Sequence, residues 1–67
     1  MERLYVMERA RDGRKVEFFS EERGGRTVYI IRENSNESQD SVTHDRGAID
    51  VFREGLLRDG YMQMPVK

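Results

Sequence analysis

The sequence lacks the groups that usually hold very small domains together. It has no Cys, which excludes disulfides and thiolate metal sites, and its single His excludes a zinc site built on histidines. The longest apolar run is the four residues 28–31, too short for a transmembrane span or a signal-peptide core. A chain of 67 residues buries only roughly 60% of its unfolded surface. We therefore expect one cytoplasmic domain, residues 1–67, that makes no membrane contact and gains stability by self-association.

A basic excess is also missing. The chain holds 12 basic and 13 acidic residues, for a net charge of −1, which argues against a dedicated duplex-DNA binder. The charge is uneven, however: residues 1–32 carry +2 and residues 33–67 carry −3. The densest basic segment supplies the candidate phosphate-binding residues, which are Arg9, Arg11, Arg14 and Lys15.

Three segments rich in β-formers predict strands at residues 3–10, 14–21 and 26–33. Asp12-Gly13 lies between the first two segments and Gly24-Gly25 between the second and third. Both pairs are typical of tight hairpin turns, because glycine adopts positive φ without strain. The first half of the chain is therefore predicted to be an antiparallel β-meander.

The second half predicts a helix at residues 46–58, with Asp45 or Thr43 as its N-cap and Gly60 just beyond its end. Apolar residues recur at spacings of three and four on one stripe, which comprises Ala48, Ile49, Phe52, Leu56 and Leu57. Phe52 lies at the centre of this stripe, so we expect its truncation to remove most of the stability of the domain.

A polar segment separates the meander from the helix. Residues 34–41 contain no apolar side chain, which predicts a flexible polar loop over residues 34–43; Val42-Thr43 either adds a short strand or leads into the helix. Residues 61–64 alternate and predict a last edge strand, after which Pro65 prevents further pairing. The predicted fold class is α+β: a three-stranded antiparallel meander, with the option of a short fourth strand, packed on one C-terminal amphipathic helix.

Strand residues alternate between the two faces of a sheet. If the helix covers Leu4, Val6, Val16, Phe18, Val28 and Ile30, the opposite face carries Tyr5, Met7, Phe19, Tyr29 and Ile31. One helix cannot cover both faces, and an apolar patch of this size typically marks an interaction surface. The sequence alone leaves open which face the helix contacts.

Three uses of this second face compete. The first is a homodimer formed face to face or through an edge strand. The second is binding of single-stranded nucleic acid, with bases stacked on the aromatic rings and phosphates held by the basic first hairpin. The third is docking of an unrelated protein. We expect a non-enzymatic binding or regulatory module that acts as a homodimer, with single-stranded nucleic-acid binding as the alternative. The homodimer is compatible with nucleic-acid binding and with docking of a protein partner.

No catalytic, cofactor or metal motif is present in the sequence. Asp40, Ser41, His44 and Asp45 are the one cluster with nucleophile and base chemistry, but a domain of this size has little room for a pocket around them. These residues are expected to supply capping oxygens instead. We predict no enzymatic activity, no cofactor and no metal.

The order of meander, polar stretch and single helix resembles the PUR-type repeats, in which strands precede one helix and the units assemble in pairs. The resemblance rests on two segments, Ala48-Ile-Asp-Val-Phe-Arg-Glu54 and Arg3-Leu-Tyr-Val6. It implies single-stranded nucleic-acid binding and a clear fourth strand before the helix, where this chain has the polar residues 34–41. No family is assigned from these two segments.

Overall fold

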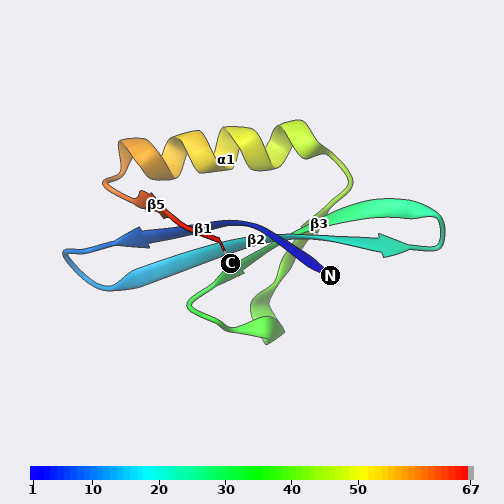
Figure 1. The fold of residues 1–67 in the computed structure, drawn as a ribbon, viewed down its shortest axis with the longest axis horizontal. Coiled ribbons are helices and arrows are strands. Elements are labelled where there is room, and N and C mark those ends of the chain that lie inside the picture. Colours follow the sequence, from blue (N-terminus) through cyan, green and yellow to red (C-terminus); the bar gives the residue numbers. More distant parts are fainter. Residues whose placement is uncertain (67) are drawn as a thin grey trace.

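The computed structural model describes residues 1–66 as one antiparallel sheet with one long helix on one of its faces (Figure 1). The strands are β1 (Glu2–Arg9), β2 (Arg14–Arg23), β3 (Arg26–Glu33), β4 (Ser41–Thr43) and β5 (Met62–Met64). A short 3-10 helix, η1 (Glu37–Gln39), precedes β4, and α1 (Arg46–Arg58) lies between β4 and β5. The strand order in the sheet is β4-β3-β2-β1-β5. The predicted α+β class, meander and C-terminal helix are confirmed.

The hairpin connections follow from glycine. Gly24 and Gly25 have φ of 57° and 78°, so they form a two-residue turn between Arg23 and Arg26, which pair directly. The first hairpin is wider than the predicted two-residue turn. Its pairing ends at Arg9 and Arg14, and the four residues between them end with Gly13 at φ 70°.

Helix α1 has the predicted bounds, and local chemistry fixes both of its ends. Asp45 is the N-cap, and its carboxylate accepts a hydrogen bond from the Gly47 backbone N–H at 2.9 Å. Thr43, the other candidate cap, accepts the Asp45 N–H through its hydroxyl oxygen at 3.1 Å. Gly60 has φ 90° just past the end of the helix, a conformation that glycine adopts without strain.

The segment predicted as a polar loop contains structure. It holds η1 and the edge strand β4, which pairs with β3 from Ser41 to Thr43. The segment 34–40 lies on the side of the sheet opposite α1 (Figure 1). The predicted edge strand at residues 61–64 is present as β5, and it pairs with β1 on the other edge of the sheet.

The core lies between α1 and one face of the sheet. Its buried members are Met7, Val16, Phe18, Ile49 and Tyr61, and the partly buried Leu4, Tyr5, Tyr29, Ile31 and Leu56 pack against them. Strand register explains this set, because directly paired residues share a face: Phe18 pairs with Tyr5 on one side and with Ile31 on the other. Met7 pairs in the same way with Val16.

The division of residues between the two faces was therefore predicted wrongly. The structure places Tyr5, Met7, Tyr29 and Ile31 on the side that α1 covers. Register places Val6, Val28 and Ile30, predicted to face the helix, on the opposite side, where Phe19 also lies. The physical reason is the length of the hairpins: both have an even number of turn residues, so odd-numbered positions pair with even-numbered ones. A bulge at Leu4, where the register shifts between Arg3 and Tyr5, changes the alternation once more.

Candidate functional site

The face opposite α1, here called the helix-free face, is the candidate binding surface. Register assigns to it Arg3, Val6, Glu17, Phe19, Val28, Ile30 and Arg32 from the three central strands. Its apolar members are nearly buried, with 2–8% of their surface exposed. The segment 34–40 lies on this side of the sheet (Figure 1), with η1 in contact with β3. The centre of the face is thus closed within one copy of the chain.

Arg32 holds the segment 34–40 against this face. Its guanidinium donates two hydrogen bonds to the Asp40 carboxylate, from Nε and Nη2, each at 2.9 Å, and lies 4.8 Å above the Phe19 ring. The hydrogen bond from Arg32 lowers the pKa of Asp40 below its usual value. A forked ion pair combined with a cation–π contact fixes the position of the guanidinium more strongly than either contact alone.

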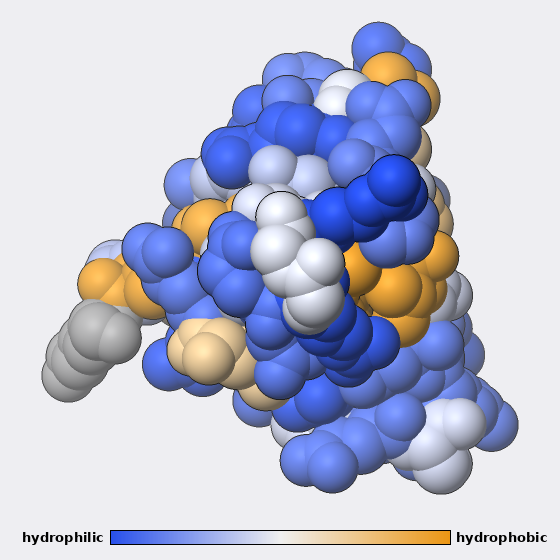
Figure 2. Space-filling model, turned by 90° about the vertical axis from the view of Figure 1, so that its right-hand side faces the viewer, coloured by the Kyte–Doolittle hydropathy of each residue, from blue (hydrophilic) through white to orange (hydrophobic). Residues whose placement is uncertain are grey.

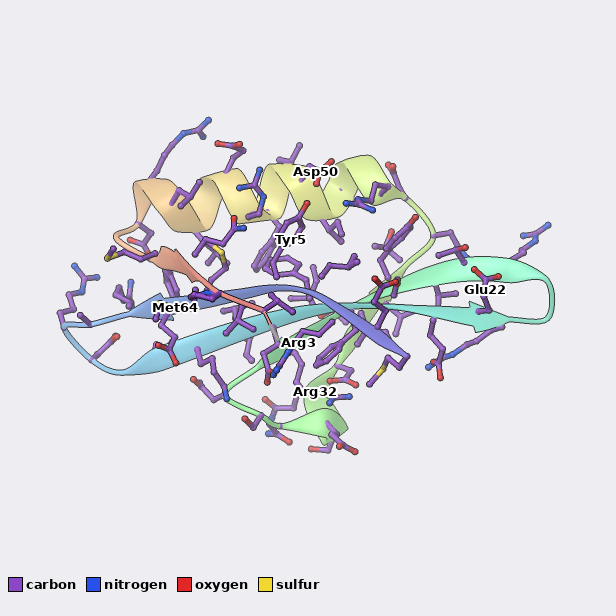
Figure 3. All side chains as sticks on the ribbon, viewed as in Figure 1. Arg3, Tyr5, Glu22, Arg32, Asp50 and Met64 are labelled. Carbon is purple, nitrogen blue, oxygen red and sulfur yellow. The ribbon has the colours of Figure 1, made fainter. Side chains whose placement is uncertain are left out.

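Glu17 is a buried carboxylate at the middle of the same face, with 6% of its surface exposed. Arg3 donates to it at 3.0 Å, and the Lys15 ammonium lies 3.8 Å away. Figure 3 shows Arg3 and Arg32 on the side of the sheet away from α1, whereas Tyr5 lies on the helix side. The floor of the helix-free face is therefore apolar, with ordered charges over its centre.

Exposed apolar side chains lie at the two outer strands of the helix-free face. Val42 of β4 pairs with Ile30 and is 50% exposed. Met64 of β5 pairs with Val6 and is 37% exposed, while Met62 pairs with Glu8 and is 67% exposed. We call these three side chains the apolar rim. Figure 2 shows hydrophobic surface as separate patches among charged side chains on the side of the molecule that it draws.

Most residues predicted to form the interaction face therefore lie on the other side of the sheet. Of the five predicted residues, Phe19 alone lies on the helix-free face, and it is covered by Arg32. Tyr5 and Tyr29 lie beneath arginines of α1, and Met7 is fully buried. The alternation of residues 61–64 is the sequence signal for the part of the apolar rim that Met62 and Met64 form.

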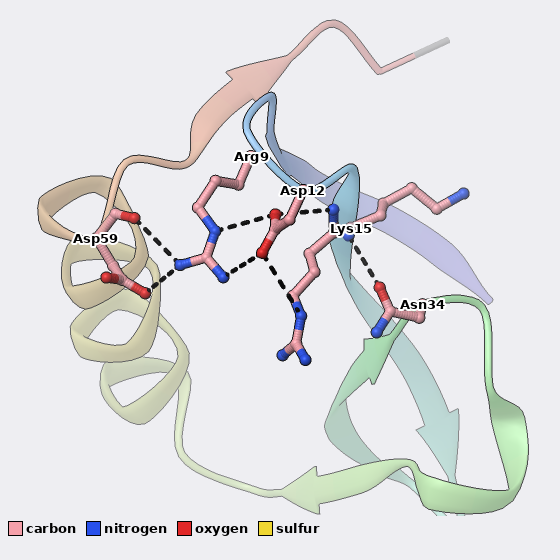
Figure 4. Close-up of polar contacts among 6 residues, drawn as sticks. Arg9, Asp12, Lys15, Asn34 and Asp59 are labelled. Atoms are coloured by element: carbon pink, nitrogen blue, oxygen red, sulfur yellow. Dashed lines mark hydrogen bonds and ion pairs between the residues drawn. The ribbon is translucent and has the colours of Figure 1, made fainter.

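The predicted phosphate-binding residues divide into one engaged arginine and three more accessible residues. Figure 4 shows the contacts of the engaged residue, Arg9, with Asp12 and Asp59. Arg9 donates from Nε and Nη2 to the two oxygens of Asp12, at 3.1 and 2.7 Å, and from Nη1 to Asp59 at 2.7 Å. Its guanidinium also lies 4.8 Å above the Tyr61 ring. Arg9 therefore ties the first hairpin to the end of α1, and its donors are already used.

The other three basic residues are less constrained. Arg11 is exposed and makes no ion pair with residues 1–66. The Arg14 side chain is 61% exposed, with Nε 3.7 Å from Asp12. Lys15 is held through its backbone N–H, which donates to Asn34 at 3.1 Å. Arg11 and Arg14 are thus the basic side chains that the first hairpin offers to a partner.

The Arg9–Asp12 pair predicts a specific acid sensitivity. The hydrogen bond from Arg9 lowers the pKa of Asp12 from 3.8 to about 2. A carboxylate whose pKa is lower in the folded state stabilises that state above its unfolded pKa, and this stabilisation is lost as the pH falls from about 4 to about 2. We expect Asp12→Asn to flatten the melting temperature against pH over this interval. An unchanged slope in the variant would show that the pair does not couple protonation to folding.

The geometry offers no catalytic constellation within residues 1–66. Asp45 caps α1 and Asp40 is held by Arg32. No group of three His, Cys, Asp or Glu side chains that could hold a metal ion occurs in this part of the chain. A hollow lined by Met1, Glu2, Ser20, Glu21 and Glu22 contains acidic groups and one hydroxyl.

Comparisons with known proteins add no functional assignment. No family model matches the chain, and neither the curated proteins nor the solved structures contain a match to it. Among residues 1–66, no helix combines the length and the apolar character needed to cross a membrane. A function must therefore be argued from the surface of this fold.

Proposed function

We propose that the protein is a small non-enzymatic binding module that acts as a homodimer through its helix-free face. The observation that carries the proposal is the apolar rim: Val42 lies at one edge of this face, and Met62 and Met64 lie at the other. A two-fold axis parallel to the strands brings β5 of one copy over β4 of the other, so the rim contacts are made twice.

Size and side-chain type support this arrangement. A domain of 67 residues without disulfides has little core of its own, so burying the rim in a partner adds stability. Methionine also suits such a surface, because its unbranched side chain adapts to irregular neighbours. The segment 34–40 lies on the same face and forms part of the proposed dimer interface.

Single-stranded nucleic acid is the second candidate, and the exposed Arg11 and Arg14 favour it. Base stacking needs accessible rings, whereas Tyr5, Tyr29 and Phe19 all lie beneath arginine side chains. The homodimer therefore has the stronger geometric support.

The test is the mass in solution by light scattering at micromolar concentration. We expect a mass near twice 7.9 kDa and a melting temperature that rises with protein concentration. The double variant Met62→Glu/Met64→Glu should be monomeric, because two like charges would be buried at each half of the interface.

The control is Val51→Glu, which places one such charge at a position of α1 that is 74% exposed; this variant should stay dimeric. A monomeric wild-type protein whose melting temperature does not depend on concentration would refute the proposal. Titration with a labelled single-stranded oligonucleotide at 0.15 M salt tests the second candidate. Submicromolar, salt-sensitive affinity would favour it over the homodimer.

A further inference from the structure

A second polar cluster lies on the other side of the sheet, between α1 and the strands. Arg46 and Arg53 are two helical turns apart on α1, and both contact the Tyr5 side chain from β1. Arg46 donates from Nη2 to the Tyr5 hydroxyl oxygen at 3.2 Å, and the Arg53 guanidinium carbon lies 5.1 Å from the centre of the Tyr5 ring. Figure 3 shows Tyr5 rising from β1 toward α1, where Asp50 lies. One phenol thus brings two guanidinium groups together.

These two arginines differ from the arginines that hold the fold together. Arg9 and Arg32 each place two donors on a single carboxylate. Arg46 has its nearest carboxylate, Asp50, at 3.9 Å, which is beyond hydrogen-bond distance. Since a guanidinium carries five N–H donors, Arg46 keeps most of its donors available.

Arg53 is also incompletely paired. Nη2 donates to Glu54 at 3.2 Å and Nη1 donates to Gln63 of β5 at 3.3 Å. Its Nε is buried and has no hydrogen-bond acceptor among residues 1–66. A buried donor without an acceptor is unfavourable, so the hydrogen-bonding capacity of Arg53 is incompletely satisfied in the unliganded chain.

The Tyr5 hydroxyl adds a third donor. Its oxygen accepts the Arg46 bond, which leaves the hydroxyl hydrogen free to donate outward. Arg46 also lies over the Tyr29 ring, with 5.7 Å between its guanidinium carbon and the ring centre. The rings hold both cations close to the sheet, so the donors are oriented before any ligand arrives.

From this cluster we infer an oxyanion-binding site for a phosphate-type dianion, formed by Arg46, Arg53 and the Tyr5 hydroxyl. The number of donors argues for a tetrahedral oxyanion, because the free N–H groups of Arg46 and Arg53 and the Tyr5 hydroxyl are too many for the two oxygens of a carboxylate to use. Asp50 and Glu54 lie beside the arginines and repel any anion, so the ligand must accept several charge-assisted hydrogen bonds to bind. A tetrahedral dianion offers several acceptor oxygens and twice the charge, which matches the forked donors of arginine.

The experiment is a titration of the protein with inorganic phosphate, with sodium chloride adjusted to hold the ionic strength constant. The readout is the Nε–H signal of Arg53 in proton–nitrogen correlation spectra. We expect a saturable shift with phosphate and none with acetate at the same ionic strength. The absence of a saturable shift of this signal would refute the site.

Three variants test whether phosphate binds specifically at this cluster or is attracted only by the positive charge of the helix. Arg53→Gln should raise the phosphate Kd about tenfold or more, the loss expected for one charge-assisted hydrogen bond; its Kd is followed through backbone amide signals of α1. Tyr5→Phe keeps the ring and should raise the Kd several-fold, which tests the site even if Arg53→Gln fails to fold. Arg58→Gln is the matched control: it removes the same charge from an exposed position on α1 and should change the Kd less than twofold. Equal losses in Arg53→Gln and Arg58→Gln would overturn the inference.

Discussion

Phe18→Ala should unfold the domain or bring it to the edge of unfolding. Phe18 is fully buried at the centre of β2 and makes edge-to-face contacts with Tyr5 and Phe52, with ring centres 5.8 and 6.0 Å apart. Truncating a buried phenylalanine costs about 3–5 kcal/mol, through lost burial and the cavity that remains. A domain of this length has roughly 3–10 kcal/mol in total, at 0.05–0.15 kcal/mol per residue. Guanidinium denaturation followed by circular dichroism measures the difference.

Phe52→Ala is the matched control, because it removes the other ring of the same contact. The sequence placed Phe52 at the centre of the buried stripe, but it is 39% exposed. We therefore expect a loss of under about 2 kcal/mol, since part of the ring is already in water. If Phe52→Ala proves as damaging as Phe18→Ala, the helix packs more deeply than the structure indicates.

Ile49→Ala should have the second-largest effect, because Ile49 is the buried residue of α1. Its side chain is fully buried in the cluster with Met7, Val16 and Phe18. Loss of this side chain should cost about 2–5 kcal/mol and loosen the helix from the sheet.

Val51 provides the comparison for Ile49, since it lies two residues away and is 74% exposed. Val51→Ala should change the free energy of unfolding by less than about 0.5 kcal/mol. Denaturation midpoints of the two variants, measured side by side, test which stripe of the helix faces the sheet. Equal midpoints would show that the assignment of the buried stripe is wrong.

Elements with a strong local signal were predictable from the sequence. Asp12-Gly13 and Gly24-Gly25 predicted both hairpins, and the residues from the Asp45 cap to Gly60 predicted the helix with its observed bounds. These signals act over a few residues, so tertiary packing does not override them. The strand β4 and the turn η1 were harder to predict, because the segment 34–41 has no apolar residue and η1 is held by ion pairs of Arg32 with Glu37 and Asp40 that no pattern in the sequence indicates.

The division of the sheet into two faces could have been predicted from the hairpins. Arg23 pairs with Arg26 across a two-residue turn, so Phe18 must lie opposite Ile31 rather than Ile30. The grouping by even-numbered positions ignored this constraint. The bulge at Leu4 has no comparable signal in the sequence, because it depends on how β1 packs against β2.

The arginine clusters could not be predicted from composition. Arg9, Arg32, Arg46 and Arg53 all lie over aromatic rings, yet two hold the fold and two keep unused donors. Arg9 pairs with the nearby Asp12 and with Asp59, fifty positions away, and Arg32 pairs with Asp40, eight positions away. Which carboxylate reaches each guanidinium depends on the folded chain.

The place of β5 in the sheet sets the order in which the chain can fold. Val6 pairs with Met64, so β1 obtains its outer neighbour only after the helix has formed and the chain has returned across the sheet. The two hairpins close over short loops and are expected to form first, whereas the β1–β5 pairing closes a long loop and should form last. Until then the outer edge of β1 is open to other chains. Glu2, Arg3, Glu8 and Arg9 place charges along this strand, which discourages intermolecular pairing while the chain is incomplete.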